Sequence, residues 1–350
     1  MMDTSAFRDL KFAGPISVEP QTKFKLLSAI NANIILLLGL TGTGKSNFLE
    51  VLSGGAGLNI SGDSLESVTQ GITVYKVVNV RMKLFSEPIF ILDCPGFCDD
   101  KTSEFKLVTM IQDWMHKTKI MGMISPEERV FSTILYFHRI TDKRLASTQK
   151  KTLQLLGTLV GDPYFYETGL TVVTTMWDTL WRPTQIQEAE KRFTQLKESL
   201  NQIIGPTANQ ALRFTNTQSS ALHIIDDASI SCLPDNVWNN IRKHLRPAPF
   251  RAFYREILRS APFADQLLQF LNDRIARLEQ SIRILEDDIQ RLDQEEHTDL
   301  CAREELVDMK KRAEEALGVV VQERLEFLAL PESQPNVARR MLNYVQNKLS

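Results

Sequence analysis

Two patterns of apolar and polar positions alternate along the first 250 residues. Short continuous runs of Ile, Leu, Val and Phe are typical of strands covered on both faces, and longer stretches with apolar residues three and four apart are typical of amphipathic helices. The predicted strands are 34–38, 72–80, 89–93, 133–138, 170–175 and 212–215; the predicted helices are 46–53, 103–121, 147–159 and 184–204. Strands that alternate with helices predict an α/β fold with three layers, αβα, around a mainly parallel sheet.

After residue 250 the pattern becomes wholly helical. From 263 to 330 there is no proline, and Gly318 is the only glycine. One apolar stripe keeps a heptad spacing without a gap: Leu268, Leu271, Ile275, Leu278, Ile282, Leu285, Ile289 and Leu292. A polar segment, 293–299, separates it from a weaker stripe: Leu306, Met309, Ala313, Ala316 and Val320. The region is either one long coiled-coil helix or an antiparallel hairpin; packing against its own domain is the alternative to a self-association or partner-binding role.

The amino-acid composition narrows the class of protein only slightly. The 350 residues are 43% hydrophobic and 24% charged, with a net charge of −2, which is ordinary for a globular protein and gives no support to nucleic-acid binding. The four cysteines, Cys94, Cys98, Cys232 and Cys301, form no CxxC pair. No signal peptide and no apolar run of about 18 residues is visible, so a cytoplasmic protein without a transmembrane segment is expected.

The first predicted strand is followed at once by a glycine-rich loop of the form GxxxxGKS, and then by a helix. The loop consists of Gly39, Leu40, Thr41, Gly42, Thr43, Gly44, Lys45 and Ser46, with Asn47 opening the helix. In this setting the backbone N–H groups cradle phosphates, Lys45 reaches the β- and γ-phosphates, and the Ser46 hydroxyl ligates Mg²⁺. The sequence therefore predicts a nucleoside triphosphate site.

Two further segments complete the phosphate side of this predicted site. Asp93 ends a strand in the run Asp-Cys-Pro-Gly, where its carboxylate can hold the water shell of Mg²⁺ and the Gly96 N–H can sense the γ-phosphate. A loop that closes over Mg²⁺ needs a hydroxyl, and Thr69 is the candidate, with Ser67 as its rival and an ordinary loop threonine as the alternative.

The base side is predicted from two segments that follow later strands. Thr175, Met176 and Asp178 lie in the run TTMWD, where the carboxylate can accept the N1–H and the exocyclic amine of guanine. Ser220 and Ala221 in the run SSA are candidates to present backbone N–H groups to the guanine carbonyl. An ATP-using enzyme that shares only the phosphate loop is the alternative, and Asp178 argues against it.

Together these motifs resemble the five guanine-nucleotide motifs of translation-factor-related GTPases. The runs DCPGFCDD and ESVTQGITVY are most similar to the septin-like branch, which includes immunity-associated GTPases and chloroplast import receptors, and YFHRITDKR resembles uncharacterised fungal members. The resemblance covers about residues 30 to 230. It implies a P-loop GTPase fold that binds GTP or GDP with Mg²⁺, the metal being held by Ser46, Thr69 and Asp93, while Lys45, Thr69 and Gly96 serve catalysis.

Two residues depart from the family pattern. Met176 stands where the family has a lysine that packs across the guanine, and Phe97 stands where Ras-like enzymes have the glutamine that orients water. Hydrolysis is therefore expected to be slow. A homodimer through the nucleotide face would let Arg139 or Arg144 act on the phosphates of the neighbour, although a solvated basic loop is the alternative reading.

The predicted organisation has three parts: 1–29 as an N-terminal extension, 30–250 as the nucleotide-binding domain and 251–350 as a helical tail. The leading hypothesis is a GTP-binding switch or assembly scaffold with slow, dimer-stimulated hydrolysis. The alternative is a nucleotide-binding structural or interaction protein with little turnover, which Phe97 and Met176 favour. In both, the tail would bind itself or another protein.

Overall fold

The chain forms two compact units in a computed structural model. The first comprises Met1–Thr102 and Thr109–Tyr254, and the second comprises Ser103–Val108 and Arg255–Ser350. The residues that the structure describes are 7–21, 33–55, 58, 60, 71–83, 88–96, 102–117, 131–161, 168–204, 210–230, 258–259, 261, 263–294 and 300–331. Five residues named above, Ser67, Thr69, Phe97, Cys98 and Cys232, lie outside these ranges.

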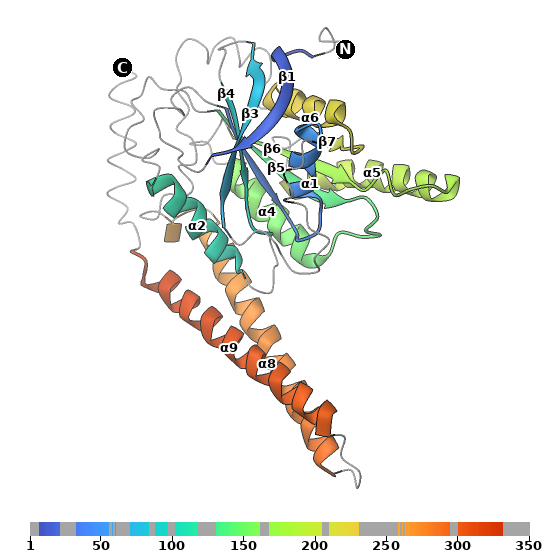
Figure 1. Cartoon of the computed structure of the whole chain (residues 1–350). Helices are drawn as coiled ribbons and strands as arrows, with labels where there is room; N and C mark the ends of the chain where they lie inside the picture. Colours follow the sequence, from blue (N-terminus) through green and yellow to red (C-terminus); the bar gives the residue numbers. More distant parts are fainter. Residues whose placement is uncertain are drawn as a thin grey trace. The chain divides into compact units, whose positions relative to one another are not determined.

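The first unit is built on one seven-stranded sheet with the order β1-β3-β4-β2-β5-β6-β7 (Figure 1). The strands are β1 (Leu10–Pro20), β2 (Asn33–Gly39), β3 (Thr73–Met82), β4 (Pro88–Asp93), β5 (Phe131–Arg139), β6 (Thr168–Thr175) and β7 (Gln210–Arg213). The five strands from β4 to β7 in this order pair in parallel, whereas β3 pairs antiparallel with both β4 and β1. All seven residues of β2 are buried, as expected of a central strand covered on both faces.

Helices cover both faces of this sheet. Among the described residues up to 230, the helices are α1 (Lys45–Leu52), α2 (Glu104–Lys117), α4 (Ser147–Gly161), α5 (Pro183–Ile204) and α6 (Gln218–Ile230). Phe48 of α1 and Ile225 of α6 share one buried cluster with Ile35, Leu37 and Phe137 of the sheet. The alternate residues of the same strands, such as Ile34, are buried on the opposite face, where α4 pairs with α5. This is the predicted three-layer αβα architecture around a mainly parallel sheet.

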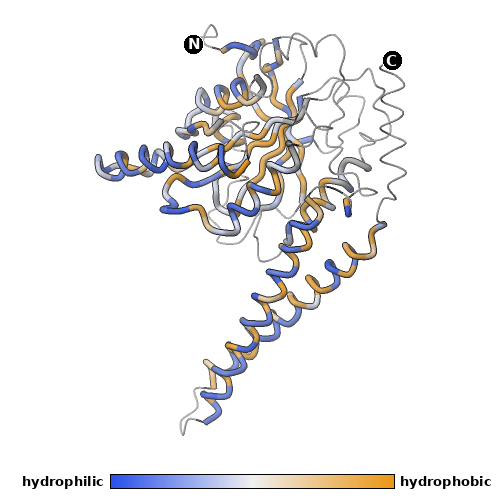
Figure 2. The backbone as a smooth tube through the Cα atoms, turned by 180° about the vertical axis from the view of Figure 1, so that it is seen from behind, coloured by the Kyte–Doolittle hydropathy of each residue, from blue (hydrophilic) through white to orange (hydrophobic). Residues whose placement is uncertain are grey.

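The hydropathy of the chain follows these layers. Figure 2 shows hydrophobic residues concentrated along the strands, and hydrophilic residues interspersed along the helices. Within the ranges that the structure describes, no helix combines the length and the apolar character needed to cross a bilayer.

The segment predicted as an N-terminal extension, 1–29, contains a strand that the sequence pattern did not predict. Residues 10–20 form β1 and complete the sheet, and Asp226 of α6 accepts hydrogen bonds from the backbone N–H groups of Arg8 and Asp9 at 2.7 Å each. The Phe7 ring stacks on His223 at 4.4 Å. This strand was not predicted from the sequence because Gly14 and Pro15 interrupt its apolar pattern. Its pairing with β3 also shifts register between Phe12 and Ser17.

The second unit contains the hairpin of α8 (Ala264–Gln294) and α9 (Leu300–Ala329). Three side-chain bonds step along the two helices in opposite directions: Arg303 to Asp293 at 2.6 Å, Lys310 to Glu286 at 2.9 Å, and Arg324 to Asn272 at 2.7 Å. Of the two forms that the sequence left open, the hairpin is therefore the one observed. The C-terminal region is helical, as predicted.

Most residues of the heptad stripe of α8 are buried or half-buried in the hairpin. Leu271 and Leu285 are buried, and most other members of the stripe are half-buried. The weaker stripe of α9 is only partly correct, because Val320 is buried whereas Met309 is 53% exposed. The stripe that predicted self-association thus packs within one chain.

Candidate nucleotide site

The glycine loop joins the carboxyl end of β2 to the first turn of α1. Gly42 and Gly44 adopt positive φ angles of 75° and 89°, which only glycine adopts at little cost. Gly44 caps α1 without a side-chain hydrogen bond to the helix. The first N–H groups of α1 thus point into the loop with the positive end of the helix dipole behind them, an arrangement that favours an anion.

Gly39 holds the close approach between this loop and β5. Its φ is 146°, and a Cβ built on it would lie 2.6 Å from the carbonyl oxygen of Phe137. We expect Gly39→Ala to lower the free energy of unfolding by about 3 kcal/mol, because backbone must move to admit the methyl group. Gly42→Ala is the matched control: a Cβ there meets nothing within 4 Å, and its cost should stay near 1 kcal/mol. Urea denaturation of both variants checks the difference; equal losses would contradict it.

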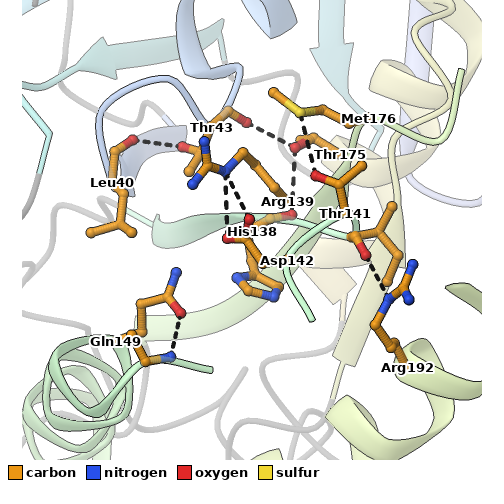
Figure 3. Close-up of polar contacts among 12 residues, drawn as sticks. Leu40, Thr43, His138, Arg139, Thr141, Asp142, Gln149, Thr175, Met176 and Arg192 are labelled. Atoms are coloured by element: carbon orange, nitrogen blue, oxygen red, sulfur yellow. Dashed lines mark hydrogen bonds and ion pairs between the residues drawn. The ribbon is translucent and has the colours of Figure 1, made fainter. Parts of the chain in front are cut away.

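Lys45 lies buried in the loop with its ammonium group turned back on the backbone. Its Nζ donates to the carbonyl oxygens of Gly39 at 3.2 Å and Leu40 at 3.0 Å. The Thr43 hydroxyl also donates to the Leu40 carbonyl oxygen, at 2.8 Å (Figure 3). These carbonyls are weaker partners for a cation than phosphate oxygens would be. The arrangement therefore suits a lysine that moves to a phosphate when one enters the loop.

The carboxyl end of β4 adds the residues suited to a metal. The Ser46 hydroxyl donates to Asp93 Oδ2 at 3.1 Å, so these two predicted Mg²⁺ ligands lie next to each other. A hydroxyl and a carboxylate are oxygen donors of the kind that Mg²⁺ prefers. Within the described ranges, no cluster of three or more His, Cys, Asp or Glu side chains could hold a metal by itself. This fits an ion held by few protein ligands together with substrate phosphates.

Gly96 packs directly against the glycine loop. A Cβ built on it would lie 2.5 Å from the Thr41 hydroxyl and 2.6 Å from the Thr41 nitrogen. The segment after β4 therefore touches the loop through backbone, which is the arrangement that a γ-phosphate sensor requires. Cys94, next to Asp93, is fully buried; burial, followed by the charge of Asp93, raises the pKa of its thiol well above the usual value, so the thiol is a poor nucleophile.

The predicted base-recognition turn is fastened to the glycine loop. The Thr175 hydroxyl donates to the Thr43 carbonyl oxygen at 2.9 Å and lies 3.4 Å from the His138 carbonyl oxygen (Figure 3). Met176 has a positive φ of 63°, rare for a residue with a side chain, and its sulfur accepts from the Thr141 hydroxyl at 3.8 Å. Strained backbone of this kind is concentrated at functional sites. The bond from Thr175 brings Asp178 to the same edge of the sheet as Lys45.

A cluster behind this turn was not predicted from the sequence. The Arg213 guanidinium lies 4.5 Å from the ring of Trp177 and 4.4 Å from the ring of Phe193, and it donates to Glu190, at 2.6 Å for the Nη1 bond. Trp177 is also fixed through Nε1 to the Thr174 hydroxyl at 3.0 Å. Trp177 therefore packs behind the turn and holds it, whereas Trp181 is 72% exposed.

The segment after β7 requires a correction. Ser220 and Ala221 belong to α6, and their N–H groups already donate to the Thr217 hydroxyl at 3.1 Å and the Thr217 carbonyl oxygen at 3.0 Å. The Ser220 hydroxyl in turn accepts from the Thr217 N–H at 3.3 Å, a reciprocal helix cap. These N–H groups are used in capping α6, so the role predicted for them at the guanine carbonyl does not fit this geometry.

Asn216 is the residue of this segment that reaches the predicted base site. Its side-chain amide donates to Asp178 Oδ2 at 2.9 Å and accepts from the Asn47 amide at 2.9 Å. Its φ of 57° places it in the left-handed region that asparagine tolerates. Among the described residues its backbone N–H has no acceptor, whereas the N–H groups of Thr215 and Thr217 have one. The sequence signal was the spacing Thr217–Ser220, which marks a helix cap and places Asn216 just before it.

The loop after β5 carries the basic residues considered for action across a dimer. The Arg139 side chain pairs with Asp142 at 3.2 Å, so its charge is engaged within its own chain (Figure 3). Arg144 is exposed. Of the two, Arg144 is the one that has no ion pair to another described residue, so it can reach a neighbouring molecule without breaking one of those.

His138 is a structural residue at the end of β5, and its burial makes the stability of the protein depend on pH. Its imidazole is buried, and among the described residues its Nδ1 has no hydrogen-bond partner. Burial lowers its pKa from the ordinary value of about 6.5, Asp142 opposes that shift, and Arg139 adds to it. The folded protein therefore resists protonation of this ring more than the unfolded chain does.

We expect this difference to destabilise the protein in acid. Above about pH 6.5 both states are neutral at His138; below it the unfolded chain takes up a proton first, and stability falls until the pH reaches the folded pKa. Wild type should lose more free energy of unfolding between pH 7.5 and 5.5 than His138→Gln, with a difference in slope of at most about 1.4 kcal/mol per pH unit. Urea denaturation at several pH values measures it; parallel losses would contradict the assignment.

Comparison with known proteins gives a likeness in structure only. No family model and no curated protein sequence matches the chain. Among solved structures, Toc33 from Arabidopsis thaliana in complex with GDP and Mg²⁺ is 14% identical with a TM-score of 0.39, covering 58% of this chain and 84% of Toc33. A dimerization-deficient Toc33 mutant is 13% identical with a TM-score of 0.40, covering 58% and 85%. These values identify neither a family nor an activity, so the function must be argued from the site itself.

Proposed function

We propose that this chain is a GTP-binding protein that hydrolyses GTP slowly and works as a nucleotide-dependent switch or assembly scaffold. The observation that carries the proposal is the bond from the Thr175 hydroxyl to the Thr43 carbonyl oxygen. It ties a turn suited to reading guanine to a loop suited to binding phosphates, so that one nucleotide can span both. The resemblance of the motifs to septin-like GTPases, including uncharacterised fungal members, supports the same reading.

Each part of the nucleotide has residues suited to it. The phosphates would lie in the loop from Gly39 to Ser46, with Lys45 turned to the β- and γ-phosphates. Asp178 would accept the two N–H groups on the Watson–Crick edge of guanine. The backbone N–H of Asn216 is the donor suited to the guanine carbonyl, in place of Ser220 and Ala221. Adenine offers neither of these patterns, so ATP should bind much less tightly.

Hydrolysis would be an in-line attack of water on the γ-phosphate. Lys45 would stabilise the charge that develops on the phosphate oxygens, and the Gly96 N–H would hold the γ-phosphate in place. Mg²⁺, held by Ser46 and Thr69 and through water by Asp93, would neutralise charge on the bound phosphates. Phe97 after Gly96 leaves no amide side chain to orient the water, which is why the reaction should be slow.

A homodimer across the nucleotide face is part of the proposal, with Arg144 or Arg139 supplying positive charge to the neighbour. The test is phosphate release with saturating GTP and Mg²⁺ at protein concentrations from about 0.5 to 50 μM. A rate per molecule that rises with concentration supports a dimer-stimulated enzyme. The second candidate, a structural protein with little turnover, is favoured by Phe97 and Met176; tight GTP binding with no release above background would select it.

A further inference from the structure

The outward side of α9 carries a second regular row of positions, separate from the side that faces α8. The outer row consists of Leu300, Glu304, Val307, Lys311, Glu314, Gly318, Val321 and Leu325. On a helical wheel it is centred about a fifth of a turn away from Arg303, Lys310 and Arg324, whose side chains bond to α8. The row therefore lies next to the hairpin contact and meets it at Glu314, whose carboxylate pairs with Lys310 at 3.5 Å.

The apolar members of the outer row are unusually exposed for such large side chains. Leu300 is 71% exposed, Leu325 52%, Val307 42% and Val321 38%. A Cβ built on Gly318 meets nothing within 4 Å, so the helix surface is open at that point. Exposed apolar side chains at a heptad-like spacing indicate a surface that packs against another helix.

The spacing of the outer row allows it to pair with a second copy of itself. The steps along the row are four and three in alternation, starting and ending with four, so the row reads the same in both directions. A two-fold axis between Lys311 and Glu314 therefore places the row antiparallel on itself. Leu300 then meets Leu325 of the second copy, Val307 meets Gly318 of the second copy, and Lys311 meets Glu314 of the second copy.

The charges agree with this register. The two central layers each pair one lysine with one glutamate, whereas a shift of one heptad along the axis would bring like charges or an unpaired charge into the apolar layers. The small Gly318 leaves room for Val307 of the second copy. Only Glu304, opposite Val321 of the second copy, does not match; its stem can cover the valine while the carboxylate reaches water. A charged pair inside an apolar row is an established means of fixing register.

We propose that α9 pairs two-fold and antiparallel with α9 of a second copy of this chain, through the outer row. The contact spans about 38 Å of helix, and a single helix pair of this size makes a weak dimer, with a dissociation constant on the order of 10 μM. The pairing needs no nucleotide, so it stands or fails independently of the proposed GTP site.

Charge reversal tests the register without removing apolar surface. Sedimentation equilibrium on the full chain, without nucleotide, should show a monomer–dimer equilibrium for wild type. Lys311→Glu and Glu314→Lys should each weaken the dimer by at least about tenfold, because like charges then meet in both central layers. Glu305→Lys is the matched control: it makes the same charge change at an exposed position off the outer row, and it should leave the dimer intact.

Two rescues exclude a merely structural effect of these variants. The double variant Lys311→Glu/Glu314→Lys should return to within about threefold of wild type, because each central layer regains one positive and one negative charge. An equimolar mixture of the two single variants should form a heterodimer, since one copy then carries two glutamates and the other two lysines. A monomeric wild type at ~200 μM, an unchanged dimer in the single variants, or the absence of both rescues would overturn the proposal.

Discussion

Lys45→Ala should weaken GTP binding by at least about 100-fold. The ammonium group of Lys45 is the only cation of the glycine loop itself, and it faces carbonyl oxygens that a triphosphate can replace as partners. A charge-assisted hydrogen bond to phosphate contributes about 3 kcal/mol, which corresponds to a factor of about 100 or more in affinity. Titration of a fluorescent GTP analogue in the presence of Mg²⁺ measures the loss.

The same substitution should leave the fold intact. The two hydrogen bonds of Lys45 to loop carbonyl oxygens are individually weak, so the midpoint of thermal unfolding should move by a few degrees at most. Lys191→Ala, an exposed lysine of α5, is the matched control and should bind GTP like wild type. Unchanged GTP affinity in a folded Lys45→Ala protein would contradict the proposal that the glycine loop binds the phosphates of GTP.

Asp178→Asn should exchange the base preference from guanine to xanthine. The carboxylate of Asp178 is suited to accept two N–H groups of guanine, and an amide at this position instead offers an NH₂ group to the C2 carbonyl of xanthine. Asn216 determines how that amide turns, because its Nδ2 donates to Oδ2 of Asp178 and will continue to require an oxygen there. The NH₂ group of the substituted side chain is thereby directed away from Asn216 and toward the base.

The expected size of this exchange is large. Affinity for GTP should fall by about 100-fold or more, because a buried polar group of the ligand loses its partner, and affinity for xanthosine triphosphate should rise by a similar factor. Asn216→Ala should weaken GTP binding and reduce the exchange when combined with Asp178→Asn. Competition titrations with both nucleotides measure it. Equal loss of both nucleotides would show that Asp178 does not read the base.

The strands and helices around the glycine loop were predictable from sequence because local and tertiary preferences agree there. β2 is buried on both faces, so its apolar run is continuous and cannot be mistaken for a loop. β1 escaped prediction for the opposite reason. It is an edge strand with much of its surface exposed, interrupted by Gly14 and Pro15, and it is held by long-range bonds to Asp226 that no local pattern encodes.

The site was predictable to the level of motifs but not to the level of individual donors. Lys45, Ser46 and Asp93 were predicted from strand ends and fixed spacing, and the Ser46 and Asp93 side chains lie within hydrogen-bond distance of each other. Ser220 and Ala221 were predicted as donors to the guanine carbonyl because the run SSA follows a strand. The helix cap at Thr217 determines which N–H groups are already hydrogen-bonded within α6. The cluster around Arg213 combines residues from β7, from α5 and from the turn after β6. These segments are far apart in the sequence, and only the fold brings them together.

Calorimetric titration of the purified full chain with GTP and with ATP, each with Mg²⁺, tests the central claim most directly. The account predicts one site per chain for GTP with at least micromolar affinity, and ATP binding weaker by about 100-fold or more. Equal affinities, or a preference for ATP, would contradict the reading of Asp178 and Asn216 as a guanine site.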